Sequence, residues 1–280
     1  MSLTQITEAS DSKKYLKEFL NKPKLEPFDN IVEPSTTRYS RVGVAFDYAL
    51  RFGLLHRLDN NVNIRSGLVA GASVYVVVKE MFPEYYDDLK SKFENAKETM
   101  ESYEISNEIN GKLAARAAFE LADLDPIFRT KMMFPSPPIT DEEITELIQL
   151  YDLIDFSIFE SHEQIFLNPT FNKGSRRVGG ADADIIAGDT LIDIKTTKHT
   201  KFTPEMLRQL VGYSLLANRF GIDYQNGDIS DQEIKKIAIY FSRGGKLFVM
   251  NLDDCISKKD QKVALEWILN HEMTRQDIKI

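Results

Sequence analysis

The sequence predicts a protein of the α/β class, in the broad sense that includes α+β folds, and two patterns support this prediction. In the first 133 residues, apolar side chains recur at the spacing of amphipathic helices. Beyond residue 160, short apolar runs bounded by turn residues are typical of β-strands, and helices with clear start signals lie among them. We therefore expect a mainly helical N-terminal region and a second half that combines strands with helices.

The helices of the N-terminal region are predicted from apolar spacing alone. Five segments carry that spacing: 13–20, 42–58, 67–81, 85–100 and 110–121. The region contains no internal repeat, no zinc-ligand spacing and no phosphate-binding glycine loop. The sequence of this region therefore predicts helices but indicates no particular chemistry.

A proline-rich stretch separates the two halves of the chain. Residues 134–139 form the densest proline cluster, and we expect a linker there between a region 1–133 and a region 140–280. Thr140 and Glu143 have the spacing of a capping box, which predicts the start of a helix. This helix, the first of the second half, carries an apolar stripe made by Ile144, Leu147, Ile148, Tyr151 and Ile154.

The most informative segment lies at 179–197 and predicts a β-hairpin, which follows a predicted strand at 163–167 in the chain. Gly188 and Asp189 are typical of a two-residue turn with glycine in its first central position. Such a turn sets the register of the two strands. Four polar residues then face each other across the hairpin, Asp184 opposite Asp193 and Asp182 opposite Lys195.

These four polar side chains project from one face, because side chains alternate along a strand, whereas residues 183, 185, 192 and 194 form an apolar opposite face. Opposed carboxylates destabilise a strand pair unless they share a proton or bind a cation. Oxygen ligands favour Mg²⁺ or Mn²⁺. A neighbouring lysine can orient a water or stabilise charge on a phosphate, so the pattern indicates metal-assisted phosphodiester hydrolysis.

The elements after the hairpin have clear boundary signals. Thr203 is a typical N-cap, and Pro204 suits the first helical position that follows it. Strands are expected at 236–242 and 246–252 around an Arg-Gly-Gly turn. A last helix is expected at 259–271.

The hairpin and the helix behind it resemble the signature of the PD-(D/E)xK nuclease superfamily. Asp184 is followed by an Asp-Ile-Lys tripeptide at 193–195 on the adjacent strand. Gln209 and Tyr213 have the Q-x-x-x-Y spacing of the RecB-like and exonuclease branch, and they share one helix face. D-x-K occurs five times in the chain, but only this copy lies in an apolar strand. The resemblance implies a restriction-endonuclease-like core, a mixed central sheet flanked by helices.

For the site, the resemblance implies that Mg²⁺ (or Mn²⁺) is bound by Asp184, Asp193 and the carbonyl of Ile194. Lys195 would position the attacking water, and the glutamine and tyrosine of the next helix would support the site or contact DNA. Asp182 is an equally literal candidate for the first ligand. We favour Asp184, because the hairpin register places it across from Asp193.

Three further residues are accessory candidates. Glu143 and Glu146 could reach the metal as outer ligands, although acidic residues at a helix start are also favoured by the helix dipole. The Gly-Leu-Leu-His sequence ending at His56 faintly resembles a Gly-x-x-His element of RecB-like nucleases. A lone histidine in an apolar helix is more often a packing residue.

The net charge of −8 is unusual for a protein that binds DNA, but the charge is unevenly distributed. Residues 173–208 contain seven Lys or Arg against five Asp or Glu. Six of these basic residues are candidates for phosphate contacts: Lys173, Arg176, Arg177, Lys198, Lys201 and Arg208. An exposed polar loop at 173–177 is the alternative interpretation of the first three.

Composition and the lack of targeting signals predict a cytoplasmic protein that has DNA as its partner and makes no membrane contact. The single cysteine, Cys255, excludes an internal disulfide. The longest apolar run is too short to span a bilayer. The helical region could clamp DNA or a protein partner, and the sequence leaves homo-oligomerisation open.

The sequence therefore predicts a metal-dependent deoxyribonuclease of the exonuclease type, acting in phage, defence or DNA-repair processing. One alternative is a restriction-type endonuclease whose helical region recognises sequence. Another is a non-catalytic module on the same fold that binds nucleic acid or protein.

Overall fold

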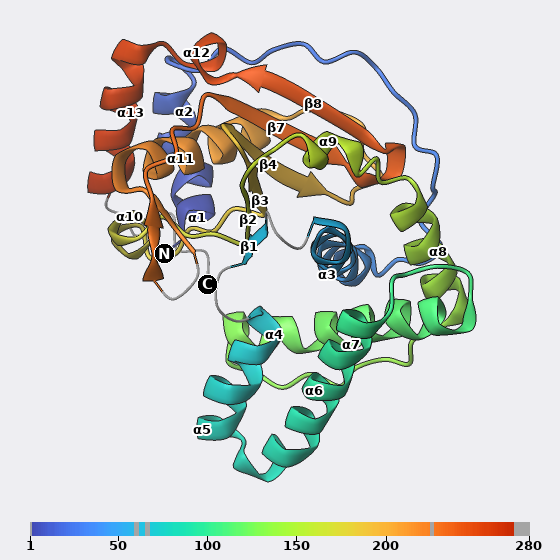
Figure 1. Ribbon diagram of the computed structural model, residues 1–280. Helices are drawn as coiled ribbons and strands as arrows, with labels where there is room; N and C mark the ends of the chain where they lie inside the picture. The colour runs from blue at the N-terminus through green and yellow to red at the C-terminus, as the bar shows by residue number, and fades with distance from the viewer. Residues whose placement is uncertain (1, 59–61, 65–67, 225–226, 272–280) are drawn as a thin grey trace.

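The computed structural model describes residues 2–58, 62–64, 68–224 and 227–271 (Figure 1). It shows a mixed α/β protein, in which a helical N-terminal region is followed by a mixed sheet with flanking helices. The predicted fold class is confirmed at this level.

The helices and strands have the following bounds. Helical segments are α1 (Leu3–Glu8), α2 (Ser10–Leu16), α3 (Tyr39–Leu58), α4 (Val69–Ala72), the π-helix η2 (Ser73–Val78), α5 (Lys79–Met81), the 3₁₀ helix η3 (Pro83–Tyr85), α6 (Tyr86–Ser102), α7 (Ile109–Thr130), α8 (Asp141–Asp152), α9 (Ser157–Glu160), α10 (Lys173–Arg177), α11 (Pro204–Phe220), the 3₁₀ helix η5 (Ser242–Gly244), α12 (Leu252–Cys255) and α13 (Lys258–Asn270). Strands are β1 (Val62–Ile64), β2 (Ile165–Leu167), β3 (Ile185–Ala187), β4 (Thr190–Lys195), β5 (Ile222–Asp223), β6 (Ile229–Ser230), β7 (Lys236–Phe241) and β8 (Lys246–Asn251).

The main sheet has six strands in the order β1-β2-β3-β4-β7-β8. Five of them come from the second half, and β1 pairs parallel with β2 at one edge. Strands β2, β3 and β4 are antiparallel neighbours, whereas β4 and β7 are parallel. A parallel pair needs a crossover connection, and α11 provides it.

Two apolar clusters cover the two faces of the sheet. On one face, α3, α7 and α8 pack against strand residues such as Ile192, and Phe46 stacks on Tyr240 with ring centroids 6.2 Å apart. On the other face, α11 packs with α1 and α13 against residues such as Phe166. In Figure 1, α3 lies between the sheet and the group formed by α4, α6 and α7. The helical region and the sheet therefore share one apolar cluster.

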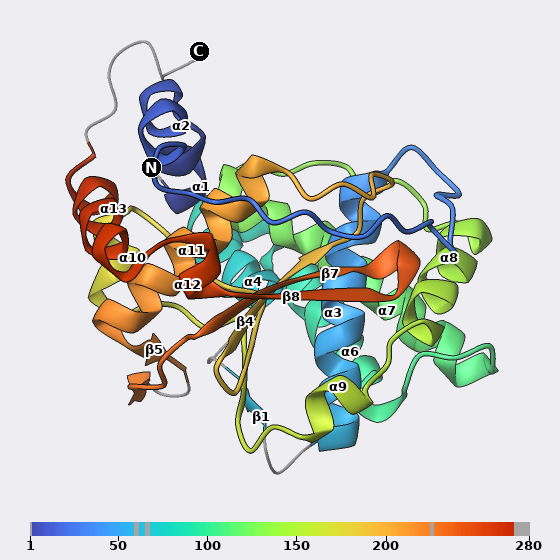
Figure 2. The same ribbon diagram turned by 90° about the horizontal axis from the view of Figure 1, so that it is seen from above.

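Residues 21–38, which we call the N-terminal strap, join α2 to α3 without regular secondary structure. The strap runs along the sheet from α12 towards α8, as the blue trace in Figures 1 and 2 shows. The amide groups of Ile31 and Val32 both donate to the carbonyl of Arg243, at 2.7 and 3.1 Å. The Arg243 side chain donates back to the Val32 carbonyl at 3.1 Å, so the strap is anchored at the β7–β8 connection.

Two segments differ from their sequence predictions. Residues 173–177, for which an exposed polar loop was the alternative interpretation, form the short helix α10, in which Ser175 is buried and its Oγ donates to the Ala181 carbonyl at 2.6 Å. Helix α7 continues through Pro126 to Thr130, since apolar residues such as Ile127 remain buried beyond the predicted end. The predicted helices at 140–154 and 203–220 are confirmed, and both have their expected threonine N-caps.

Candidate active site

The predicted hairpin forms with the predicted turn. β3 and β4 pair through Ile185–Ile192 and Ala187–Thr190, with Gly188 in the left-handed conformation at φ 54°. The ladder ends at the Ile185–Ile192 pair, one residue before Asp184. Beyond that point the strands separate, which brings polar groups to the end of the sheet.

Asp184 contacts β4 through its side chain instead of through the strand ladder. The Ile194 amide donates to Asp184 Oδ2 at 2.7 Å. The backbone around Asp184 follows β2 instead, since its carbonyl accepts from the Asn168 amide at 2.9 Å. Asp182 forms a bridge with Thr170, so the predicted pairing of Asp182 with Lys195 is wrong.

Asp193 and Lys195 lie on one face of β4, as alternation predicts, and their Oδ2 and Nζ atoms are 2.8 Å apart. Lys195 also donates to Gln209 Oε1 at 3.4 Å. The Gln209 amide donates to the Tyr213 hydroxyl at 3.0 Å and to Thr4 Oγ1 at 3.3 Å. A continuous polar chain therefore links β4, α11 and α1.

The electrostatics of the site reflect crowding of acidic groups. Burial raises the pKa of Asp184 from 3.8 to about 8, and the Asp193 and Asp47 carboxylates add to the rise. Burial also raises the pKa of Asp193, and Lys195 partly opposes that effect. Burial alone would lower the pKa of Lys195, but Asp193 raises it above its usual value, so the lysine stays protonated. The site therefore resists the simultaneous ionisation of Asp184 and Asp193, and a bound cation would relieve that resistance.

Asp47 and Arg51 of α3 extend this polar group, and neither was among the predicted site residues. They form an i,i+4 ion pair, and the charge of Arg51 acts on Asp184. The Oδ1 atom of Asp47 is buried without a hydrogen-bond partner. A signal was present, because these are the only charged residues in the apolar stretch 42–55. Helix α3 therefore lies beside the site, where outer ligands from α8 were expected.

A second polar layer connects the site to α7. The Tyr48 hydroxyl donates to Asp125 Oδ2 at 3.1 Å, and Arg129 Nε lies 3.4 Å from Asp125 Oδ1. The charge of Asp182 acts on Arg129. Its charge also acts on Asp47 and Tyr213, so Asp182 remains near the site, but Asp184 is the aspartate that contacts β4, through the Ile194 amide.

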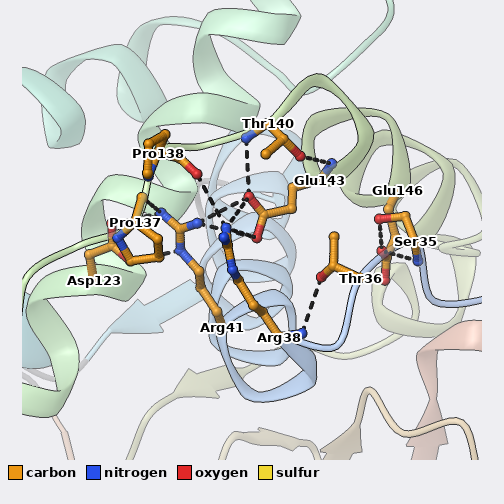
Figure 3. A network of polar contacts seen from close by, with 10 residues as sticks. All are labelled: Ser35, Thr36, Arg38, Arg41, Asp123, Pro137, Pro138, Thr140, Glu143 and Glu146. Atoms are coloured by element: carbon orange, nitrogen blue, oxygen red, sulfur yellow. Dashed lines mark hydrogen bonds and ion pairs between the residues drawn. The ribbon is translucent and has the colours of Figure 1, made fainter.

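Glu143 and Glu146 lie in a separate ion-pair network (Figure 3). Arg41 Nη1 lies 3.0 Å from Glu143 Oε2, and Arg38 Nη1 lies 3.4 Å from Glu143 Oε1. Glu146 accepts from the Ser35 amide at 2.7 Å and from the Arg243 guanidinium at 2.5 Å. Both carboxylates are occupied by these partners, so the structure places neither among the candidate ligands.

The remaining candidates are His56 and six basic residues, which differ in whether their side chains are exposed. His56 Nε2 lies 2.8 Å from the Met100 carbonyl, which is a packing contact between α3 and α6. Arg208 is buried and donates to the Thr7 carbonyl at 2.9 Å, so it does not face a phosphate. Five basic residues are exposed on the surface: Lys173, Arg176, Arg177, Lys198 and Lys201.

The donor set suits a hard divalent cation. Asp184 and Asp193 supply carboxylate oxygens, and Asp193 shares its Oδ2 with the Lys195 ammonium at 2.8 Å. Among the described residues, no group of three or more His, Cys, Asp or Glu side chains is arranged to hold a metal ion. A cation would therefore take its other ligands from a backbone carbonyl, water or substrate, as Mg²⁺ commonly does.

Comparison with protein-family models finds no matching family, and comparisons with curated proteins and with solved structures find no match.

No helix within the described residues has the length and apolar character needed to cross a membrane.

Proposed function

We propose that the protein is a metal-dependent nuclease that hydrolyses DNA phosphodiester bonds. The observation that supports this proposal most directly is the convergence of Asp184, Asp193 and Lys195 at the end of β4. Asp193 is buried and Asp184 is half-buried, and burial raises the pKa of both carboxyl groups, so their joint ionisation opposes folding in the absence of a counter-ion.

The topology around the site supports assignment to a PD-(D/E)xK core. Strands β2, β3 and β4 form an antiparallel meander, and α11 crosses over to place β7 parallel to β4. This matches the mixed sheet and second helix that the sequence resemblance implies. Helix α3 takes the place of the first core helix beside the carboxylates.

Each residue has a chemical role in this proposal. Asp184 and Asp193 would hold the cation, which would supply a water of lowered pKa and a positive charge for the phosphate. Lys195 is held by Asp193 and Gln209, which fixes its ammonium group where it can orient the attacking water. Tyr213 positions Gln209 through the 3.0 Å hydrogen bond between them.

The test is cleavage of labelled linear and circular DNA, in single- and double-stranded forms, with Mg²⁺ or Mn²⁺. Wild-type protein should degrade DNA only with metal, and Asp193→Asn should reduce the rate on the order of 10³-fold. Asp189→Asn is the matched control, because this aspartate lies at the hairpin turn and pairs with Lys236 at 3.5 Å, away from the site.

The substrate pattern discriminates the alternatives. Digestion of linear DNA alone supports an exonuclease, whereas discrete fragments from circular DNA support a restriction-type endonuclease. Equal rates in wild type and Asp193→Asn would reject the proposed site. Metal-independent binding without cleavage of any DNA would instead support a non-catalytic module.

A further inference from the structure

A cavity of about 300 Å³ lies beside the proposed catalytic lysine. Its walls are Tyr39, Ser40 and Gly43 of α3 and the residues 194–199 that end β4 and follow it. Lys195 belongs to this lining and also pairs with Asp193. The cavity therefore adjoins the proposed catalytic centre.

A second cavity, of about 680 Å³, adjoins the first at Tyr39 and Ser40. Its lining is largely apolar and includes Val44, Ala122 and the proline-rich residues 134–137. We call the two cavities together the α3 groove. The groove extends from Lys195 past Tyr39 to the proline-rich stretch.

Exposed aromatic rings line the α3 groove. Tyr39 is 39% exposed and Phe134 is 53% exposed, although a large apolar ring is normally covered. Lys198 Nζ lies over one face of the Tyr39 ring, 5.5 Å from its centre. The other face of the ring provides a stacking surface for a nucleobase, and the lysine provides a charge for its phosphate.

One lysine gives the groove a charge that can meet a phosphate. Among the residues that line its two cavities, only Asp123 is acidic, and Arg41 binds both of its carboxylate oxygens, at 2.8 and 2.9 Å. Arg38 and Arg41 pair with Glu143, and Lys195 pairs with Asp193. Lys198 is therefore the cation of the lining that offers its charge to a phosphate.

The loop that carries Lys198 is held in place before any ligand binds. Thr197 Oγ1 accepts from the His199 amide at 3.1 Å. The Asn30 side chain, from the N-terminal strap, donates to the Lys198 carbonyl at 2.9 Å. A preorganised loop lowers the entropy that binding must overcome.

We propose that the α3 groove binds an extended single strand of DNA, with one base stacked on Tyr39, and leads it to the catalytic carboxylates. This proposal rests on the proposed nuclease function and names its substrate as single-stranded DNA or a frayed duplex end. A cavity of about 300 Å³ accommodates a nucleotide-sized group and is too small for a duplex.

The test is the affinity of a fluorescently labelled 12-nucleotide single strand, measured by anisotropy in metal-free buffer at low salt. Tyr39→Ala should weaken binding at least about five-fold, since base–aromatic stacking is lost, whereas Tyr39→Phe should bind within about two-fold of wild type. Gly43→Leu should weaken binding about ten-fold or more by filling the cavity. It should remain folded, because a Cβ at this helical position meets only Thr196 Cβ, at 3.7 Å.

Tyr103→Ala is the matched control, because Tyr103 is similarly exposed but lies outside the groove. Equal affinities in Tyr39→Ala, Gly43→Leu and wild type would overturn the proposal, as would a clear preference for duplex DNA or RNA of the same length. Metal-dependent cleavage with Tyr39-independent binding would retain the nuclease and reject the groove. Tyr39-dependent binding without cleavage would retain the groove and reject the nuclease.

Discussion

The acidic site at the end of β4 and the ion-pair network in Figure 3 both bury carboxylates, but they differ in how those charges are balanced. Glu146 accepts hydrogen bonds from Arg243 and from the amide and hydroxyl of Ser35. Asp193 is only 6% exposed and pairs with Lys195 at 2.8 Å, but among the described residues the neighbouring Asp184 carboxylate has no cationic side chain of its own at that distance, and repulsion from Asp193 helps to raise its pKa. Several donors around one carboxylate indicate a structural role, whereas two crowded aspartates beside one lysine leave capacity for a cation.

The largest expected effect comes from breaking the balanced network. Glu146→Ala should lower the free energy of unfolding by about 3–5 kcal/mol, because it leaves the fully buried Arg243 guanidinium without its carboxylate. Urea denaturation measures this change. A loss smaller than about 1 kcal/mol would show that the network contributes little to stability.

Metal binding should stabilise the folded protein, and this gain should depend on the aspartates at the end of β4 and not on Glu146. At an Mg²⁺ concentration 100 times its dissociation constant, the wild-type protein should gain about 2.7 kcal/mol, seen as a rise of several degrees in Tm. Asp193→Asn should lose this rise, and Glu146→Ala should keep it. An unchanged Tm of the wild type at millimolar Mg²⁺ and Mn²⁺ would argue against a cation site.

The stability of the metal-free protein should decrease as pH increases from about 4 to about 8. Native Asp184, with its pKa raised to about 8, keeps a proton that the unfolded chain releases near 3.8. The native state therefore binds more protons in this window, and each such group contributes a slope of up to about 1.4 kcal/mol per pH unit. Denaturation at several pH values in chelator should show this slope, and Asp184→Asn should flatten it. A slope that Asp184→Asn leaves unchanged would contradict the assignment.

The smallest expected effect concerns the helix start beside the balanced network. Thr140 Oγ1 accepts a hydrogen bond from the Glu143 amide at 3.3 Å, and Glu143 Oε2 accepts one from the Thr140 amide at 3.1 Å. Thr140→Ala should cost about 1 kcal/mol, because one N-terminal amide loses its acceptor. Thermal unfolding measures this loss, and DNA cleavage should not change. A loss of activity would instead connect α8 to the catalytic site.

Local signals in the sequence predicted much of the second half. The Gly188 turn defined the β3–β4 register, and the Thr203 N-cap located α11 with Gln209 and Tyr213 on the side that reaches Lys195. These predictions depend on residues close together in the chain. The alternation rule also placed Asp193 and Lys195 together, because it needs only a single strand.

The parts that could not be predicted depend on contacts between distant segments. Asp47 approaches the site only because α3 packs across the end of the sheet. Glu143 and Glu146 were considered metal candidates because nothing local to α8 indicates that Arg41 and Arg243 bind them. The predicted pairing of Asp182 with Lys195 was wrong because the hairpin register does not reveal where the two strands separate, and Asp182 instead bridges Thr170.

The N-terminal strap has a consequence for the order in which the molecule is completed during synthesis. Its Val32 carbonyl accepts from Arg243, 211 positions later in the chain, and its Ser35 contacts Glu146, 111 positions later. The ribosome must therefore release the β7–β8 connection before the strap can dock. Because Asn30 of the strap holds the Lys198 loop, a nascent chain lacks the finished groove until the β7–β8 connection has been translated.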